Sequence, residues 1–254
     1  MGAGTTRVAC AANMVTADVA ANLRRIEDMA SDAAARGAKL VLYPETALTG
    51  LINTDNPAHD LPLGQTIPGP LTSRLAALAR DLGLYLGLGL FEREGERLYD
   101  SAVLLGPEGD LALRHRRIHP GWTGPNADRD VYALGDDVPL ALTALGSFAF
   151  LICGDMWDDS VVARCREHRP DYILYPFARC FPDGAWDQER WDREERAEYV
   201  RRAASTGATV LMVNYLAAPE LEGGAFGGAM IVSPAGELIA ELPLGREGLL
   251  VAEV

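Results

Sequence analysis

The feature that most constrains the fold is an apolar run that stops abruptly at a cysteine. Phe148 to Ile152 is continuously apolar and of strand length, and Cys153-Gly154-Asp155 ends it. Such a run is typical of a strand buried on both faces of a sheet. Open α/β proteins bind ligands at the ends of such strands, so Cys153 is either a nucleophile at the mouth of a sheet or a buried structural cysteine. Gly154 leaves room for a substrate, and its backbone N–H can donate to an oxyanion.

Length and composition favour one domain spanning residues 1–254. The chain is 48% hydrophobic and shows no linker, charge block, repeat or apolar run long enough to cross a membrane. Its net charge of −13 argues against a nucleic acid or an anionic membrane as partner. The N-terminal residues do not resemble an export signal, so we expect a cytoplasmic protein with reduced thiols. Neither the four cysteines nor the four histidines have metal-binding spacing, and no metal site is expected.

Apolar periodicity indicates helices alternating with strands, followed by hairpins. Residues 50–68 have the composition of an irregular loop. This order predicts an α+β fold with two mixed β-sheets and helices outside them. Helices are predicted at 19–36, 71–82, 160–168 and 194–206, and strands at 7–12, 39–43, 84–90, 98–105, 111–117, 148–152, 172–175, 209–214, 228–233, 237–242 and 249–254.

Three side chains with complementary chemistry lie at the ends of predicted strands. Glu45 follows one strand, Arg117 closes another, and Cys153 ends the central apolar run. Acyl transfer through a thioester needs a carboxylate to move protons and a thiolate to attack. It also needs a cation that, with a backbone N–H, holds the oxyanion. Each residue has an ordinary interpretation too, because an acid can begin a helix and an arginine can be the solvated end of a strand.

The same residues lie in motifs that resemble those of the nitrilase superfamily, the carbon–nitrogen hydrolases, in the same order and over nearly the full chain. The resemblance implies a four-layer α-β-β-α sandwich and a homodimer. It also implies cysteine-dependent hydrolysis of an amide, carbamoyl or nitrile bond without metal or cofactor. Glu45 would then be the general base, Cys153 the acylated nucleophile, and Arg117 with the Gly154 N–H the oxyanion site. The matching segments are Tyr43-Pro-Glu45, Arg116-Arg-Ile-His119, Ile152-Cys-Gly-Asp155, Leu174-Tyr-Pro-Phe-Ala178, Val213-Asn214 and the hairpin from Gly227 to Glu237.

Two positions depart from the family pattern. The catalytic lysine of the family falls on Arg117, and its second glutamate falls on Asp128 if Gly135 is the matching glycine. Only Lys39 among the 23 basic residues is a lysine. Arg117 can therefore reflect either the general use of arginine in this chain or a change in function. Arginine stays charged, whereas lysine can carry and release a proton. If this site is active, we expect Arg117 to be an electrostatic anchor that pairs with Asp128.

The leading prediction is an amidase that hydrolyses a non-peptide C–N bond in a small amide or carbamoyl compound. One alternative is a catalytically silent protein that keeps the fold for binding or scaffolding. Another is acyl transfer to an amine, because it shares the first half-reaction with hydrolysis. Arg179 is expected to receive a substrate carboxylate, and the loop at 50–68 and the segment at 179–191 are expected to border the pocket. Candidate aromatic walls of that pocket are Trp122, Trp186 and Trp191.

Overall fold

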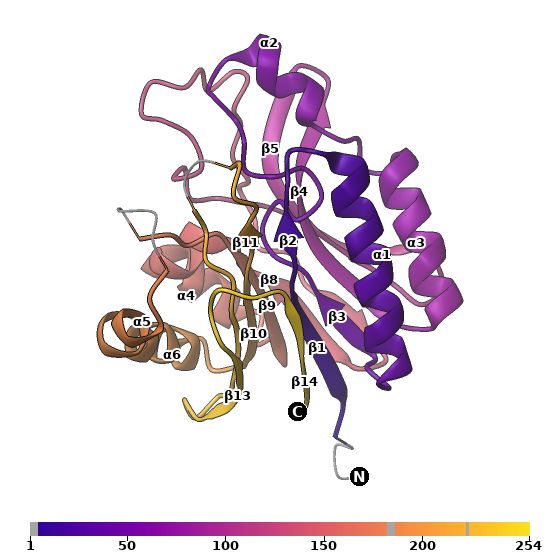
Figure 1. The fold of residues 1–254 in the computed structure, drawn as a ribbon, viewed down its shortest axis with the longest axis vertical. Coiled ribbons are helices and arrows are strands. Elements are labelled where there is room, and N and C mark those ends of the chain that lie inside the picture. The colour runs from indigo at the N-terminus through magenta and orange to yellow at the C-terminus, as the bar shows by residue number, and fades with distance from the viewer. Residues whose placement is uncertain (1–4, 182–185, 222–223) are drawn as a thin grey trace.

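The computed structural model describes residues 5–181, 186–221 and 224–254. Within these ranges two six-stranded sheets pack face to face, and helices cover the outer face of each sheet (Figure 1). The predicted α+β fold with four α-β-β-α layers is confirmed. None of the helices in this part of the chain is long and apolar enough to cross a membrane.

The first sheet carries the strand that leads to Glu45. Its order is β14-β1-β3-β4-β5-β6, with β1, β3 and β4 parallel to one another and the other pairs antiparallel. The strands predicted at 98–105 and 111–117 form an antiparallel hairpin. The strand β4 is longer than the predicted 84–90, because its pairing with β5 continues to Glu94 and Arg97. The strands are β1 (Arg7–Ala12), β3 (Leu40–Leu42), β4 (Tyr85–Glu94), β5 (Arg97–Leu105), β6 (Leu111–Arg116) and β14 (Gly248–Glu253).

The second sheet carries the strand that leads to Cys153. Its order is β13-β12-β10-β9-β8-β7, and β8, β9 and β10 run parallel. Two short strands, β2 (Met14–Val15) and β11 (Leu216–Ala217), pair separately. They escaped prediction, as did β7, because two or three residues carry no readable periodicity. The sheet comprises β7 (Ala141–Thr143), β8 (Gly146–Phe150), β9 (Tyr172–Phe177), β10 (Thr209–Asn214), β12 (Ala229–Val232) and β13 (Leu238–Leu242).

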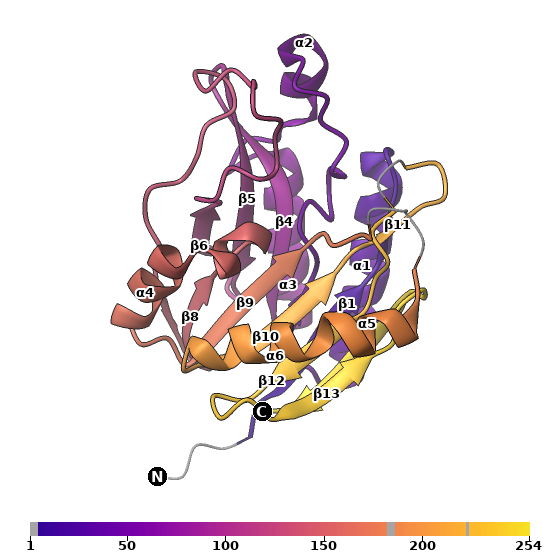
Figure 2. The same ribbon diagram turned by 90° about the vertical axis from the view of Figure 1, so that its left-hand side faces the viewer.

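The helices form the two outer layers. α1 and α3 lie on the first sheet, and Figure 2 shows α5 and α6 crossing the outer face of β9 and β10. The single helix predicted at 194–206 is wrong: Glu195, with φ −124°, separates two helices. The loop at 50–68 contains the short helix α2 (Pro57–Asp60) and a 3-10 turn, η1 (Leu61–Leu63). The other helices are α1 (Val19–Ala35), α3 (Pro70–Leu82), α4 (Asp159–Glu167), α5 (Gln188–Glu194) and α6 (Arg196–Ser205).

Three hydrophobic cores separate the four layers, and the alternation of side chains along the strands creates them. In β1, Val8 and Cys10 face the second sheet, whereas Ala9 and Ala11 face α1 and α3. Both faces of the strand are buried, which explains why the sequence shows apolar runs instead of an apolar–polar alternation. This packing fixes the positions of the strand ends, where the predicted functional side chains emerge.

Candidate active site

The backbone after β3 brings Glu45 against the neighbouring strand. A Cβ atom on Gly89 of β4 would lie 2.5 Å from the Thr46 nitrogen and 2.7 Å from the Glu45 Cα. Gly89 therefore permits an approach that no other residue allows, and its N–H donates to the Pro44 carbonyl at 3.0 Å. The Glu45 side chain is fully buried as a result.

Arg117 emerges directly after β6 and reaches two carboxyl groups. Its Nη1 donates to Glu45 Oε1 at 2.7 Å and to Asp100 Oδ2 at 3.2 Å. Its backbone N–H also donates to the Asp100 carbonyl at 2.8 Å, which extends the pairing of β5 beyond the end of β6. All three residues are at most 3% exposed. The predicted neighbourhood of Glu45 and Arg117 is therefore present, with an additional carboxyl group.

Cys153 occupies a strained position at the start of the 3-10 turn η2 (Cys153–Trp157). Its φ is +44°, a region that a non-glycine residue adopts at an energetic cost and that is found at many functional sites. The Tyr175 hydroxyl donates to the Cys153 carbonyl at 3.0 Å and accepts from Trp157 Nε1 at 3.3 Å. These contacts from β9 and the turn hold the backbone of the cysteine in place.

The surroundings of the thiol keep it protonated at neutral pH. Burial and the facing Glu45 carboxylate raise the pKa of Cys153 to about 12, although Arg117 and the Ala178 backbone act in the opposite direction. Burial alone would lower the pKa of Arg117, but Cys153, Glu45 and Asp100 together raise it above its usual value. The cation is therefore permanent, and a thiol in this setting must lose its proton to a base as it attacks. Glu45, whose carboxylate faces the thiol, is the candidate for that base.

Asp100 is a member of this cluster that the sequence analysis missed. It is 1% exposed and is the one acid in the largely apolar and buried strand β5. Burial first, and then the Glu45 carboxylate, raise the pKa of Asp100 well above its usual value, and Arg117 only partly opposes this. The available signal was a lone acid inside an apolar strand, because a buried acid without a partner is rare.

Asp155 ties the Arg117 and Cys153 segments together. Its fully buried carboxylate accepts from His115 Nε2 at 2.9 Å and from the backbone N–H groups of Ile118, His119 and Ile152 at 2.8 to 3.0 Å. Four donors on one carboxylate hold the exit of β6 against the exit of β8. The last residue of the cysteine motif therefore positions the site and does not face the substrate.

Glycine is required at position 154 because the side chains of His119 and Arg117 approach its backbone closely. A Cβ atom there would lie 2.4 Å from His119 Nδ1 and 2.7 Å from Arg117 Nη2. The space that the sequence analysis reserved for a substrate is thus partly filled by these two side chains. Gly154 still lines the cavity that opens beside Cys153.

This cavity has a volume of about 490 Å³ and is walled by the α5–α6 junction and the segment after β9. Arg179 lies in its wall, as expected, but its guanidinium is engaged by both carboxylate oxygens of Glu195. The break between the two helices at Glu195 makes this ion pair possible. The residues that line the cavity are Cys153, Gly154, Trp157, Ala178, Arg179, Glu194, Glu195, Glu198 and Tyr199.

The expected contact between Arg117 and Asp128 is wrong. Asp128 is exposed, and its carboxylate accepts from the Asp130 N–H within its own turn. The carboxyl partners of Arg117 are Glu45 and Asp100 instead. The short ungapped match to Gly135 could not reveal that the turn directs this carboxylate to the surface.

The three candidate tryptophans lie outside the cavity wall. Trp122 is 5% exposed and packs between Phe91 and Tyr132, in a cluster that also takes up the leucines of the 50–68 loop. Trp191 is buried in the core beneath α5 and α6. The loop at 50–68 does not line the cavity either, and residues 182–185 of the 179–191 segment lie outside the described part of the chain.

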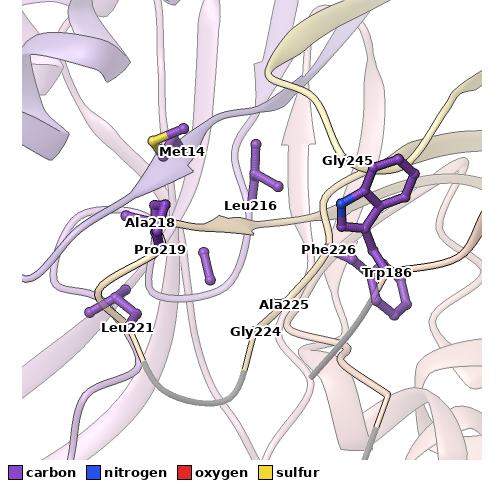
Figure 3. Close-up of a pocket in the computed structure, with 11 residues that line it drawn as sticks. Met14, Trp186, Leu216, Ala218, Pro219, Leu221, Gly224, Ala225, Phe226 and Gly245 are labelled. Atoms are coloured by element: carbon purple, nitrogen blue, oxygen red, sulfur yellow. The ribbon is translucent and has the colours of Figure 1, made fainter. Parts of the chain in front are cut away.

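Trp186 walls a separate hollow of about 480 Å³ (Figure 3). Its ring lies against Gly245, where a Cβ atom would come within 2.7 Å of the indole. Met14 and Leu216 line the opposite part of this hollow. Across the described residues, no group of three or more His, Cys, Asp or Glu side chains is arranged to hold a metal ion.

Comparison with known proteins decides the family. The model of the carbon–nitrogen hydrolase family matches residues 7–254. The chain belongs to this family. An aliphatic nitrilase of Sinorhizobium fredii is 30% identical over 272 residues, covering 93% of this chain and 82% of the nitrilase. An omega-amidase of Xenopus tropicalis is 27% identical, covering 87% of this chain and 78% of that protein.

Solved structures agree with this assignment. The NitN amidase of Nesterenkonia sp. AN1 superposes with a TM-score of 0.80 at 25% identity, covering 98% of this chain and 92% of the amidase. In one structure of a variant of that amidase, the acetamide moiety of fluoroacetamide is bonded to the active-site cysteine. In a structure of a different variant, butyramide is bound. This member of the carbon–nitrogen hydrolases is an amidase-like hydrolase.

Proposed function

We propose that this carbon–nitrogen hydrolase cleaves small amides through a thioester on Cys153, with Glu45 as the general base. The observation that carries the proposal is the position of the Glu45 carboxylate. It faces the Cys153 thiol on one side and accepts from Arg117 at 2.7 Å on the other. A base, a nucleophile and a fixed cation thus meet at the end of a cavity large enough for a small amide.

Acylation can be written with every proton accounted for. The Cys153 sulfur attacks the amide carbon as its proton passes to Glu45, and the carbonyl electrons move onto the oxygen. When the tetrahedral intermediate collapses, the C–N bond breaks and Glu45 returns its proton to the departing nitrogen. Ammonia or an amine leaves, Glu45 is again a carboxylate, and the acyl group remains on Cys153 as a thioester.

Deacylation repeats the cycle with water in place of the thiol. Glu45 takes a proton from water as its oxygen attacks the thioester. The C–S bond then breaks, and the proton returns to the departing sulfur. The carboxylic acid product leaves, and the thiol and the carboxylate are restored. An amine in place of water would give acyl transfer, so the supply of nucleophile decides between the two outcomes.

Arg117 serves this cycle as a charge that never exchanges its proton. Its Nη1 is used by Glu45 and Asp100, while its Nη2 lies beside Gly154 at the floor of the cavity. A donor in that position, together with the Gly154 N–H, can stabilise the developing oxyanion. Glu45 then performs all proton transfers, because a buried guanidinium stays protonated.

The cavity favours substrates without a carboxylate. Arg179, the cation in its wall, is neutralised by Glu195, and Glu194 and Glu198 also line the space. A substrate carboxylate would find no available guanidinium among the described residues of this wall. Simple uncharged amides, and carbamoyl compounds of similar size, fit this wall.

Release of ammonia from a panel of small amides tests the proposal. The panel should include butyramide, acetamide, a dicarboxylic acid monoamide and an aliphatic nitrile. We expect the wild-type protein to release ammonia fastest from the uncharged amides, and Cys153→Ala to release none above the blank. Folded wild-type protein that leaves every amide intact would favour the silent binding protein instead.

A further inference from the structure

The cluster around Arg117 contains one carboxyl group more than its positive charge can balance. Glu45 and Asp100 both accept from the same nitrogen, at 2.7 and 3.2 Å, which brings the two carboxyl groups face to face. All three side chains are at most 4% exposed. We propose that Asp100 is a positioning residue of the acyl-transfer reaction and that its carboxyl group and that of Glu45 share one proton beside Arg117.

The charge count requires that proton. Two carboxylates and one guanidinium would leave a net negative charge buried in a region without solvent, which is strongly unfavourable. Like-charged carboxyl groups in contact do not both ionise, and one of them retains a proton. The other groups near Asp100 do not provide a second positive charge. Cys153 is a thiol, and Asp155 is a further anion already committed to His115 and three backbone N–H groups.

Unpartnered oxygens point to the same arrangement. Within the described residues, Glu45 Oε2 and Asp100 Oδ1 are buried and have no hydrogen-bond partner. Glu45 faces Asp100 on one side and Cys153 on the other. A proton held by Asp100 supplies the missing donor between the carboxyl groups, so that Glu45 is an oriented carboxylate aimed at the thiol.

The role assigned to Asp100 rests on the proposed function and follows from the arginine. Arg117 cannot donate a proton to the pair, so Asp100 must hold one throughout the cycle for Glu45 to be a single, balanced anion. The proton on Asp100 is never transferred to substrate. Asp100 acts through its two neighbours. It holds the Glu45 carboxylate in position as the base and holds the Arg117 guanidinium in one orientation.

The shared proton can be observed without any substrate. The infrared difference spectrum between wild type and Asp100→Asn at pH 7 should contain the carbonyl band of a protonated carboxylic acid that the variant lacks. Asp60→Asn is the matched control. Asp60 is also fully buried, but hydrogen bonds from His59, Tyr132 and Thr54 outweigh burial and lower the pKa of its carboxyl group. That spectrum should show the loss of a carboxylate and no acid band.

The second readout is the rate at which iodoacetamide alkylates Cys153 at pH 7. Asp100→Ala leaves Arg117 with Glu45 as the one remaining acceptor of Nη1 among the described residues and releases both side chains from their fixed positions, so labelling should slow at least about thirtyfold. Asp100→Asn reproduces the protonated group, with an oxygen toward Arg117 and an N–H toward Glu45. It should restore the rate to within about tenfold of wild type.

Either of two results would overturn the inference. One is the absence of the acid band from the wild-type difference spectrum. The other is an Asp100→Asn protein that is folded, by circular dichroism, yet labels as slowly as Asp100→Ala. Failure of the proposed hydrolysis is a separate outcome. It would appear as intact amides in the ammonia assay, while the infrared band tests only where the proton resides.

Discussion

Arg117 makes several contacts at once that a lysine at the same position, with its single nitrogen, could not make together. A guanidinium carries several N–H groups in a rigid plane, so Nη1 can hold Glu45 and Asp100 while Nη2 lies beside Gly154. A lysine ammonium is a compact charge at the end of a flexible stem. The arginine therefore has a geometric role in this chain, and the low lysine content does not by itself explain its position.

Removal of this cation should reduce catalysis. We expect Arg117→Met to lower kcat/KM for the best amide by at least about thirtyfold, which corresponds to about 2 kcal/mol and is the scale of one oxyanion donor. Arg117→Lys should recover only part of the loss, because an ammonium beside Glu45 cannot also reach the Gly154 side of the site. Steady-state ammonia release measures all three proteins.

Asp128→Asn is the matched control for these variants. Asp128 is exposed and its contacts stay within its own turn, so the neutral amide should change kcat/KM by less than about twofold. If Asp128→Asn reduced activity as strongly as Arg117→Met, Asp128 would belong to the site after all. A fully active Arg117→Met protein would instead make the arginine a matter of composition alone.

At the scale of elements, the Asp155 carboxylate fixes how the exits of β6 and β8 meet. Burial acts to raise its pKa, but the hydrogen bond and charge of His115 and the backbone donors outweigh burial and lower it. A carboxylate with a lowered pKa in the folded state stabilises the fold above its ordinary value of 3.8. This contribution is lost as the pH falls through the lower, folded-state value.

Asp155→Asn should destabilise the protein by at least about 2 kcal/mol at pH 7. The amide keeps one acceptor oxygen but turns N–H groups toward donors, which leaves buried N–H groups unpaired. Urea unfolding at pH 7 measures the free energy of unfolding. The gap between wild type and variant should shrink below about pH 4, because the Asp155 carboxylate of the unfolded chain then takes up a proton that the folded protein does not bind.

Asp158→Asn makes the same chemical change three residues later and serves as the control. Asp158 caps α4 by accepting from the Ser160 and Val161 N–H groups, and asparagine is an equally good cap. Its free energy of unfolding should stay within about 0.5 kcal/mol of wild type. Equal destabilisation by the two substitutions would show that Asp155 is no more than another acid near the helix.

At the scale of the whole molecule, the sequence predicted the sheets better than the site. Runs such as Phe148–Ile152 reveal buried strands because their periodicity is local, and the ends of those strands located Glu45, Arg117 and Cys153 correctly. The carboxyl partner of Arg117 was misassigned because it comes from a neighbouring strand. Asp100 meets Arg117 through the pairing of β5 with the chain after β6, which no spacing in the sequence reveals.

The break at Glu195 has a similar origin. Residues 194–206 have a continuous helical pattern, yet the chain forms two helices, and Glu195 holds Arg179 from a distant segment. Local propensity is a weak guide when a long-range ion pair competes with it. The residues that shape the cavity are thus those whose positions depend on tertiary contacts.

The oligomeric state of the protein is the prediction that concerns the whole molecule. The family resemblance leads us to expect a two-fold dimer that buries α4 and part of the C-terminal segment, with upwards of about 1,000 Å² of interface. Light scattering at micromolar concentration should give twice the chain mass of 27.3 kDa. Ala163→Arg on the exposed face of α4 should shift the mass toward the monomer, while Ala35→Arg, on the exposed end of α1, should not. A wild-type mass of one chain would contradict the expected dimer.

The most direct test of the central claim is the site of covalent labelling by limiting iodoacetamide, which alkylates a thiolate with loss of iodide. Cys10 and Cys165 are fully buried, and the pKa of Cys153 is raised to about 12, so rapid labelling at pH 7 requires a base in contact with a particular thiol. Peptide mass mapping should find the adduct on Cys153 in wild type. In Glu45→Gln, labelling of Cys153 should be slower than in wild type at pH 7 and should rise with pH, because the thiol has lost its base. Equal labelling of several cysteines, or a Glu45→Gln protein that labels like wild type, would contradict a Cys153 nucleophile activated by Glu45.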